Sequence, residues 1–156
     1  MHPVTANHPP LMLKPPTLFL AFIVTGVALN LALPLLAFPG YVQYLIGPFL
    51  IAEGLIIIGM AFRQLNRASN NTSTDKSIPP LVTRGVYRFS RNPIYLGMFI
   101  GYVGIALLSS NVWLLILELP LFLAIKYGVI LREEENLSGV FGAAYTDYRA
   151  GTRRWI

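Results

Sequence analysis

The sequence predicts an all-α integral membrane protein with four transmembrane helices and a C-terminal amphipathic helix on the cytoplasmic side. Only 12% of its 156 residues are charged and 54% are hydrophobic, whereas a soluble domain carries about 25% charged residues. Four apolar runs reach or approach the length of about 20 residues that crosses the hydrocarbon core. The polar segments alternate between basic and uncharged along the chain. These observations favour a single membrane domain that comprises residues 1–156.

The first two apolar runs are residues 17–38 and 41–62, and Pro39-Gly40 forms a turn between them. Five prolines precede the first run, so residues 1–16 are expected to form an irregular tail. Pro34 is expected to kink the outer end of the first helix. Glu53 lies near the middle of the second run, where a charge is costly. It is either a polar contact inside the bundle or a group with a substrate or proton role.

The third run, residues 94–108, begins just after Pro93, a favoured first residue of a helix. The polar segment before it, residues 63–77, predicts a flexible loop. Gly97, Gly101 and Gly104 follow spacings of four and three, which place them along one helix face. They either permit close approach of a neighbouring helix or leave room for a ligand, and the sequence leaves both interpretations open.

The fourth run, residues 112–131, contains Glu118, Lys126 and a kink-forming Pro120. Lys126 can extend its amine to the nearer membrane surface. The net charge of +5 does not indicate a nucleic-acid partner, because the cations adjoin apolar spans. The absence of cysteine excludes disulfides, thiolate metal sites and a cysteine nucleophile, and we predict no metal site.

Most lysines and arginines lie in the segment between the second and third runs and in the segment after the fourth. The two opposite loops carry neither residue type. The positive-inside rule therefore places both basic segments and both termini in the cytoplasm. We expect a multi-pass protein of a bacterial inner membrane.

The two basic segments, residues 79–97 and 132–149, are expected to fold together into a cofactor site on that face. The first interleaves arginines with aromatic residues and leads directly into an apolar helix. In the second, a helical stripe places one carboxylate on the same inward face as apolar and aromatic residues. The members of this stripe are Glu133, Leu137, Phe141, Tyr145 and Tyr148.

An inward carboxylate needs a cationic partner. For Glu133 the partner is either an arginine from residues 84–91 or a bound cation. Gly142 is expected to break this helix. The closing Arg153-Arg154-Trp155 is interpreted either as an interfacial anchor or as a segment that closes the site over its ligand.

The segments LVTRGVYRFSRNPIYLG and EEENLSGVFGAAYTDYRAGTRRWI resemble the isoprenylcysteine carboxyl methyltransferase family and its bacterial relatives, which belong with the phospholipid methyltransferases. The pattern R-x-P-x-Y-x-G, followed by E-E-x-x-L-x-x-x-F-G-x-x-Y-x-x-Y, carries this resemblance. It covers residues 81–156, about half of the chain.

The resemblance implies that S-adenosylmethionine is the cofactor and that a small lipophilic molecule from the bilayer is the methyl acceptor. Aromatic faces and a carboxylate suit the sulfonium and ammonium of this donor. Its own carboxylate suits either Arg91 or backbone N–H groups near the start of the third run. Catalytic roles are implied for Arg91, Asn92 and Glu133, and Thr72 is a weaker candidate for contact with the cofactor. The implied cofactor-binding residues are Pro79, Pro80, Leu81, Val82, Tyr87, Asn92, Pro93, Ile94, Tyr95, Glu133 and Glu134.

Two positions depart from the prenylcysteine enzymes. Those usually have histidine where this chain has Asn92, and an arginine for the substrate carboxylate where it has Val129. Arg132 or Lys126 could substitute as substrate-binding residues. The departures argue against a prenylcysteine carboxylate as the acceptor and leave oxygen, sulfur and nitrogen open as the acceptor atom.

Two other function classes stay open. The first is a membrane reductase, similar to sterol reductases, that uses NADPH; the arginines of both basic segments would hold the phosphates. The second is a non-catalytic tetraspan protein whose arginines contact anionic lipid. Binding of S-adenosylmethionine, of NADPH or of neither separates the three.

Overall fold

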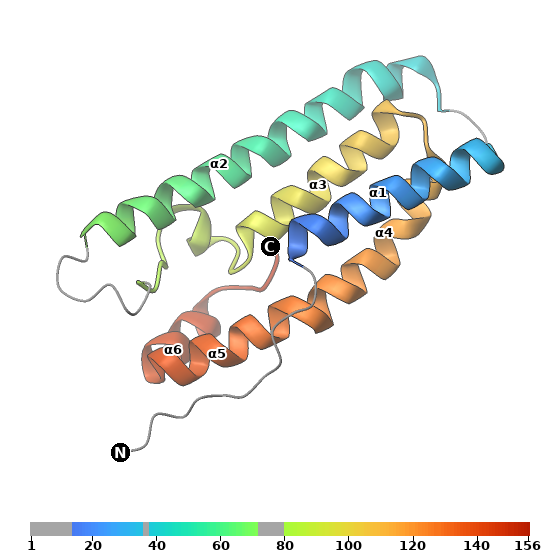
Figure 1. The fold of residues 1–156 in the computed structure, drawn as a ribbon. Helices are drawn as coiled ribbons and strands as arrows, with labels where there is room; N and C mark the ends of the chain where they lie inside the picture. Colours follow the sequence, from blue (N-terminus) through green and yellow to red (C-terminus); the bar gives the residue numbers. More distant parts are fainter. Residues whose placement is uncertain (1–13, 36–37, 72–79) are drawn as a thin grey trace.

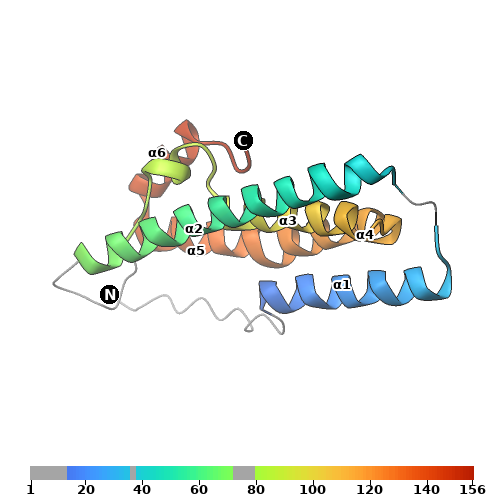
Figure 2. The same cartoon turned by 90° about the horizontal axis from the view of Figure 1, so that it is seen from above.

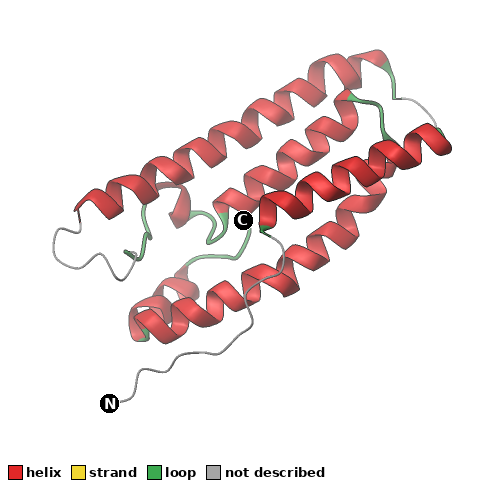
Figure 3. Ribbon diagram, in the orientation of Figure 1, coloured by secondary structure: helices red, strands yellow, loops and turns green. Residues whose placement is uncertain are grey.

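The computed structural model describes residues 14–35, 38–71 and 80–156, and all regular secondary structure within these ranges is helical (Figure 1, Figure 3). The helices are α1 (Pro15–Ala32), α2 (Gly47–Asn71), α3 (Pro93–Leu108), α4 (Val112–Ile125), α5 (Leu131–Phe141) and α6 (Ala143–Gly151). A π-helical turn, Val42–Ile46, leads into α2, another, Lys126–Ile130, joins α4 to α5, and a 3₁₀ turn, Gly85–Arg88, precedes α3.

Three continuous helical stretches are long and apolar enough to cross a membrane: Pro15–Ala32, Val42–Asn70 and Val112–Phe141. Helix α3 is equally apolar but shorter. The predicted all-helical membrane architecture is therefore confirmed for the described residues. Figure 1 shows α1, α2, α3 and α4 side by side, with α5 and α6 beyond one end of the bundle and the last residues of the chain returning toward the start of α3.

Three predicted boundaries were wrong. Helix α1 already includes Pro15 and Pro16, because a helix tolerates proline in its first turn. It ends at Ala32 rather than bending at Pro34, since the residue before a proline disfavours the helical conformation. Helix α2 continues to Asn71, through residues predicted as loop. Residues 63–68 are mostly good helix formers, so the helix extends beyond its apolar part.

Helices α2 and α3 form the most extensive packing in the bundle, because glycines bring their backbones together. A Cβ atom at Gly54 would lie 2.5 Å from the carbonyl oxygen of Gly97, and one at Gly97 would lie 2.7 Å from the carbonyl oxygen of Gly54. Gly104 meets Gly47 and Ile51 in the same way. Close helix approach is thus confirmed for Gly97 and Gly104. The backbone nitrogen of Gly101 also lies 2.9 Å from a Cβ atom built at Gly54, although a Cβ atom at Gly101 itself would have no neighbour within 4 Å.

Helix α1 packs on α4. The view from above shows α1 and α2 on opposite sides of α3 (Figure 2). The Asn111 amide, which caps α4, donates to the Gly26 carbonyl at 3.1 Å. The buried rings of Phe19 and Phe99, 5.1 Å apart, connect α1 to α3. This core anchors α3, whose first turn carries the site described below.

Candidate functional site

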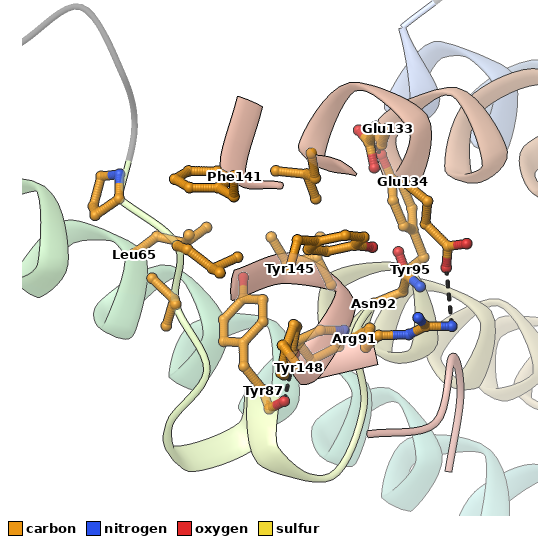
Figure 4. Close-up of a pocket in the computed structure, with 16 residues that line it drawn as sticks. Leu65, Tyr87, Arg91, Asn92, Tyr95, Glu133, Glu134, Phe141, Tyr145 and Tyr148 are labelled. Atoms are coloured by element: carbon orange, nitrogen blue, oxygen red, sulfur yellow. Dashed lines mark hydrogen bonds and ion pairs between the residues drawn. The ribbon is translucent and has the colours of Figure 1, made fainter. Parts of the chain in front are cut away.

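A cavity of about 310 Å³ lies where the first turn of α3 meets α5, α6 and the end of α2 (Figure 4). This volume is at the lower end of the range of about 300–1,000 Å³ typical of small-molecule sites. The lining residues are Leu65, Pro80, Leu81, Val82, Tyr87, Arg91, Asn92, Pro93, Ile94, Tyr95, Glu133, Glu134, Leu137, Phe141, Tyr145 and Tyr148. All of them except Leu65 come from the two basic segments that the sequence predicts to fold together.

The wall formed by residues 80–92 is held against α2 by a glycine turn. Gly85 has a φ of +61°, a conformation that favours glycine. The Gln64 side chain of α2 lies where a Cβ of Gly85 would project. With its amide oriented to satisfy both neighbours, Gln64 donates to the Arg84 carbonyl at 2.6 Å and accepts from the Val86 N–H at 3.2 Å. The extension of α2 beyond its apolar part therefore positions the loop that carries Tyr87 and Arg91.

Glu133 contributes a carboxylate to the cavity. Its Oε1 accepts a hydrogen bond of 2.8 Å from the Tyr95 hydroxyl, which joins α5 to α3. Within the described residues no arginine or lysine forms an ion pair with Glu133. The arginine partner expected for it from residues 84–91 belongs instead to Glu134. Glu133 is exposed, and among the described residues the neutral Tyr95 hydroxyl is the hydrogen-bond partner of its carboxylate.

Glu134, the next residue, is buried between two arginines. Arg154 donates from Nε to Oε1 at 2.9 Å and from Nη2 to Oε2 at 2.8 Å. Arg91 Nη2 lies 3.3 Å from Oε1 of the same carboxylate, a contact drawn in Figure 4. Such a two-point pairing fixes the orientation of a guanidinium as well as its position. The hydrogen bonds to Glu134 raise the pKa of Arg154 above its ordinary value.

Arg91 keeps unused donors beside the cavity. Its side chain is only 8% exposed. The Nε and Nη1 groups are buried and have no hydrogen-bond partner within the described residues. Leaving a buried donor unpaired costs about 1–3 kcal/mol, and more for a charged group. Arg91 therefore favours an anionic group of a ligand at this end of the cavity.

The last residues of the chain form a strap across the loop before α3. The Arg153 carbonyl accepts from the Arg91 N–H at 3.0 Å, and the Arg154 carbonyl accepts from Ser90 Oγ and Asn92 Nδ2, both at 3.2 Å. Trp155 packs its ring 5.2 Å from that of Phe122. The strap thus ties residues 90–92 to α4.

Tyrosines from α6 and the 3₁₀ turn line the opposite wall (Figure 4). The Tyr148 hydroxyl donates to the Tyr87 carbonyl at 2.5 Å. Burial raises the pKa of Tyr87 to about 12, and the nearby Glu133 carboxylate adds to the effect. Burial also raises the pKa of Tyr148 to about 12, with a further contribution from Tyr145. These phenols stay protonated at physiological pH and offer aromatic faces to a ligand.

All but one of the residues assigned to the cofactor line this cavity. The exception, Pro79, lies outside the described residues, as does Thr72. The structure does not bring the two candidate substrate residues to the cavity: Arg132 is exposed on α5, and the Lys126 amine lies 5.1 Å from the centre of the Tyr127 ring. Val129 is 1% exposed within the core, so this position does not face the cavity.

Five further lining residues had no assigned binding role. Leu137, Phe141, Tyr145 and Tyr148 belong to the predicted inward stripe, and that stripe was the available signal. The helix breaks at Gly142, as predicted, where φ is +54°. Leu65 lies in a segment predicted as loop, and its spacing of seven residues from Ile58 was the signal for continued helix.

Comparison with known proteins identifies one family. The model of the phospholipid methyltransferase family matches residues 42–144, which include α2, α3, α4 and α5. No curated protein and no solved structure matches the chain.

Proposed function

The chain belongs to the phospholipid methyltransferase family, and on this premise we propose that it is an integral-membrane methyltransferase that uses S-adenosylmethionine. The membrane methyltransferase class follows from the family and from the apolar helices. The cofactor, its site and a small lipophilic methyl acceptor are our proposal. The observation that carries it is the pairing, within one cavity, of an uncompensated carboxylate with an arginine that has unused donors.

The residues of the cavity fit this cofactor in charge and shape. S-adenosylmethionine carries two positive groups, the sulfonium and the ammonium, and one carboxylate. Glu133 would hold a positive group, and the neighbouring tyrosine faces would support it through cation–π attraction. Arg91 would hold the carboxylate through its free Nε and Nη1 groups. The apolar stripe of α5 and α6 suits the uncharged part of the molecule.

When bound, the cofactor supplies a methyl group that its positively charged sulfur activates. The sulfur becomes part of a neutral thioether leaving group when a lone pair of the acceptor takes the methyl group. Such a displacement needs alignment and exclusion of water rather than a nucleophilic side chain. Arg91 and Glu133 orient the donor, and Tyr95 holds Glu133. Asn92 is 8% exposed and donates to the strap, so we assign it a structural role beside the cavity.

We further propose that α3 is a fourth transmembrane helix and that residues 1–156 form one domain. The close packing of α3 on the long helix α2 supports the fourth span, because two glycine pairs hold the helices together along its length. The basic residues around the cavity support a cytoplasmic site. Both termini would then be cytoplasmic, in a bacterial inner membrane.

Calorimetric titration of the purified protein in detergent tests the proposal. We expect S-adenosylmethionine and S-adenosylhomocysteine to bind with micromolar dissociation constants and NADPH to show no heat of binding. Thermal unfolding measured on the same sample establishes that the protein is folded. Absence of binding by both sulfur compounds in folded protein, or binding of NADPH instead, would contradict the proposal.

A further inference from the structure

The turn before α3 has an inward and an outward face. The inward face carries Tyr87, which is 8% exposed and lines the cavity, and Ser90, which is buried and donates to the strap. The outward face carries Arg84, Arg88 and Phe89, which are all exposed, Phe89 to 72%. We call these three residues the interfacial patch. Because both faces belong to one short segment, a contact made by the patch also restrains the wall of the cavity.

The interfacial patch lies at the depth where α2 leaves its apolar part. Residues 42–62 contain a single charged residue, and Arg63 begins the polar end of the helix. At 1.5 Å per residue, this apolar part covers about 30 Å, the thickness of the hydrocarbon core. Gln64 holds the backbone of residues 84–86 through its amide. The turn is therefore level with the first polar turn of α2, at the depth of the lipid headgroups.

The charge around the interfacial patch is positive. Residues 63–71 and 80–92 contain no aspartate or glutamate. The two arginines of the patch form no ion pair with any residue that the structure describes. Arg63 and Arg67, one helical turn apart on α2, add two exposed positive charges beside Gln64. This surface is therefore complementary to an anionic partner.

The position and the exposed ring of Phe89 favour a lipid surface as that partner. Figure 2 shows the turn, in yellow-green, on the same side of the bundle as α6 and on the side opposite α1. The turn thus projects sideways from the helices, over the region that headgroups occupy around the protein. Aromatic side chains are favoured at this depth, and arginines there are attracted to anionic lipids.

We propose that the interfacial patch binds the headgroups of anionic phospholipids and that this contact strengthens cofactor binding. The coupling to the cofactor rests on the proposed function, whereas the lipid contact does not. The turn carries Tyr87 and continues directly into Arg91, which has unused donors beside the cavity. A headgroup that holds Arg88 therefore limits the movement of both residues. By linkage, the cofactor strengthens headgroup binding by the same factor.

The test uses the purified full chain in lipid nanodiscs made of phosphatidylcholine alone or of equal parts of phosphatidylcholine and phosphatidylglycerol. Calorimetric titration with S-adenosylhomocysteine measures cofactor binding without an acceptor, because this ligand has no methyl group to transfer. Native mass spectrometry counts the phosphatidylglycerol molecules that the protein retains on release from the mixed discs.

Three double variants separate charge from structure. Arg84→Gln with Arg88→Gln removes both charges of the patch, and Arg84→Lys with Arg88→Lys keeps them. The matched control combines Arg132→Gln with Arg153→Gln, which removes the same charge from exposed positions outside the patch. All substituted side chains are exposed, so the variants are expected to fold as the wild type does.

We expect the wild type, the lysine variant and the control to bind S-adenosylhomocysteine about fivefold more tightly in mixed discs, a factor at the lower end of those typical of coupled sites. The glutamine variant should have the same dissociation constant in both kinds of disc. It should also retain less phosphatidylglycerol than the control does.

Equal dissociation constants of the wild type in the two kinds of disc would overturn the inference and leave the patch to an acidic protein partner. A glutamine variant that keeps the full difference would overturn it as well. Failure of the folded wild type to bind the ligand in either disc would instead contradict the proposed function. The retained phosphatidylglycerol then still tests the lipid contact by itself, so the two failures are distinguishable.

Discussion

Glu133 and Glu134 are adjacent in the chain but have different surroundings. Glu134 is buried and paired with two arginines, so its charge is compensated within the protein. Glu133 faces the cavity with a tyrosine hydroxyl as its partner. The difference follows from the helix, which turns successive side chains by about 100°. One carboxylate therefore stabilises the fold, and its neighbour is available to a ligand.

The first prediction concerns the charge of Glu133. Glu133→Gln should weaken S-adenosylmethionine binding about tenfold or more, because a hydrogen-bonded charge contributes about 1.5–3 kcal/mol. If Glu133 pairs with the sulfonium, the loss should be smaller for S-adenosylhomocysteine, whose sulfur is neutral. Calorimetric titration of the wild type and of Glu133→Gln with both ligands forms a thermodynamic cycle that isolates the free energy of this pairing. Asp147→Asn, at an exposed position outside the cavity, is the control.

Equal losses for the two ligands would assign Glu133 to the ammonium, which both of them carry. Wild-type affinity in Glu133→Gln would remove this residue from the cofactor site.

The second prediction concerns the hydroxyl of Tyr95. Tyr95→Phe removes the hydrogen bond to Glu133 but keeps the ring on the cavity wall. We expect cofactor binding to weaken about fivefold, since a typical hydrogen bond contributes about 1 kcal/mol. Tyr127→Phe, at a position that is 58% exposed and outside the cavity, should bind as the wild type does. The measurement is the dissociation constant for S-adenosylhomocysteine; an unaltered value in Tyr95→Phe would contradict a positioning role for this hydroxyl.

At the scale of elements, the strap and the helix pair hold the site from two sides. The strap fixes residues 90–92 through backbone carbonyls and fixes Glu134 through Arg154. The pair of α2 and α3 fixes the position of the first turn of α3. The two elements act on the same segment, because Asn92 is the residue that precedes α3.

The third prediction tests the strap. Arg154→Gln removes both hydrogen bonds to Glu134 and should lower the free energy of unfolding by about 2 kcal/mol. Arg91 then remains the ion-pair partner of Glu134 among the described residues, so it should be drawn toward that carboxylate and bind the cofactor less well. Arg153→Gln is the control, since the Arg153 side chain is exposed and, among the described residues, donates a hydrogen bond to the Ile156 carbonyl rather than to Glu134. Thermal unfolding and calorimetry are the measurements, and equal behaviour of the two variants would refute this role of the strap.

The fourth prediction tests the helix pair. Gly54→Ala places a Cβ atom 2.5 Å from the Gly97 carbonyl oxygen and should destabilise the protein by about 1–3 kcal/mol, as overpacking does. Gly59→Ala adds the same methyl group where nothing lies within 4 Å and should be neutral or slightly stabilising. Unfolding in a denaturing detergent measures both. A Gly54→Ala protein as stable as Gly59→Ala would contradict the packing described here.

At the scale of the whole molecule, the candidate site lies at one end of the bundle, where the first turn of α3 meets α5 and α6. In the function that we propose, the water-soluble cofactor enters this cavity from the basic face. Helix α3 also lines a second, apolar hollow of about 190 Å³ together with α1 and α2. It therefore contributes to the apolar bundle, to the close packing on α2 and to the candidate site.

The fifth prediction tests the orientation of the molecule. The chain has no cysteine, so Gly40→Cys and Asp147→Cys each introduce a single thiol at an exposed position. In intact spheroplasts, a membrane-impermeant maleimide should label Gly40→Cys, and it should label Asp147→Cys only after the membrane is opened. The basic face is then cytoplasmic. The opposite labelling pattern would place the cavity outside the cytoplasm.

The sequence alone determined the helical membrane class, because composition and apolar length decide which segments leave water. It also determined which two segments form the cavity and the inward stripe of α5 and α6, since helical periodicity places residues on a face. It did not determine where α2 ends, because good helix formers continue past the apolar run and Gln64 stabilises the extension through contacts with residues 84–86.

Only the tertiary structure decided how charges are paired and what each glycine does. Sequence spacing placed Glu133 inward but could not show that both arginines meet Glu134, because Arg91 and Arg154 reach it from distant parts of the chain. Gly97 and Gly101 are equivalent in sequence pattern, yet a Cβ atom at Gly97 would lie 2.7 Å from the Gly54 carbonyl oxygen, whereas one at Gly101 would have no neighbour within 4 Å. Interaction partners and empty volume depend on which elements, far apart in the sequence, lie next to one another in the fold. A local sequence pattern carries no information about these neighbours.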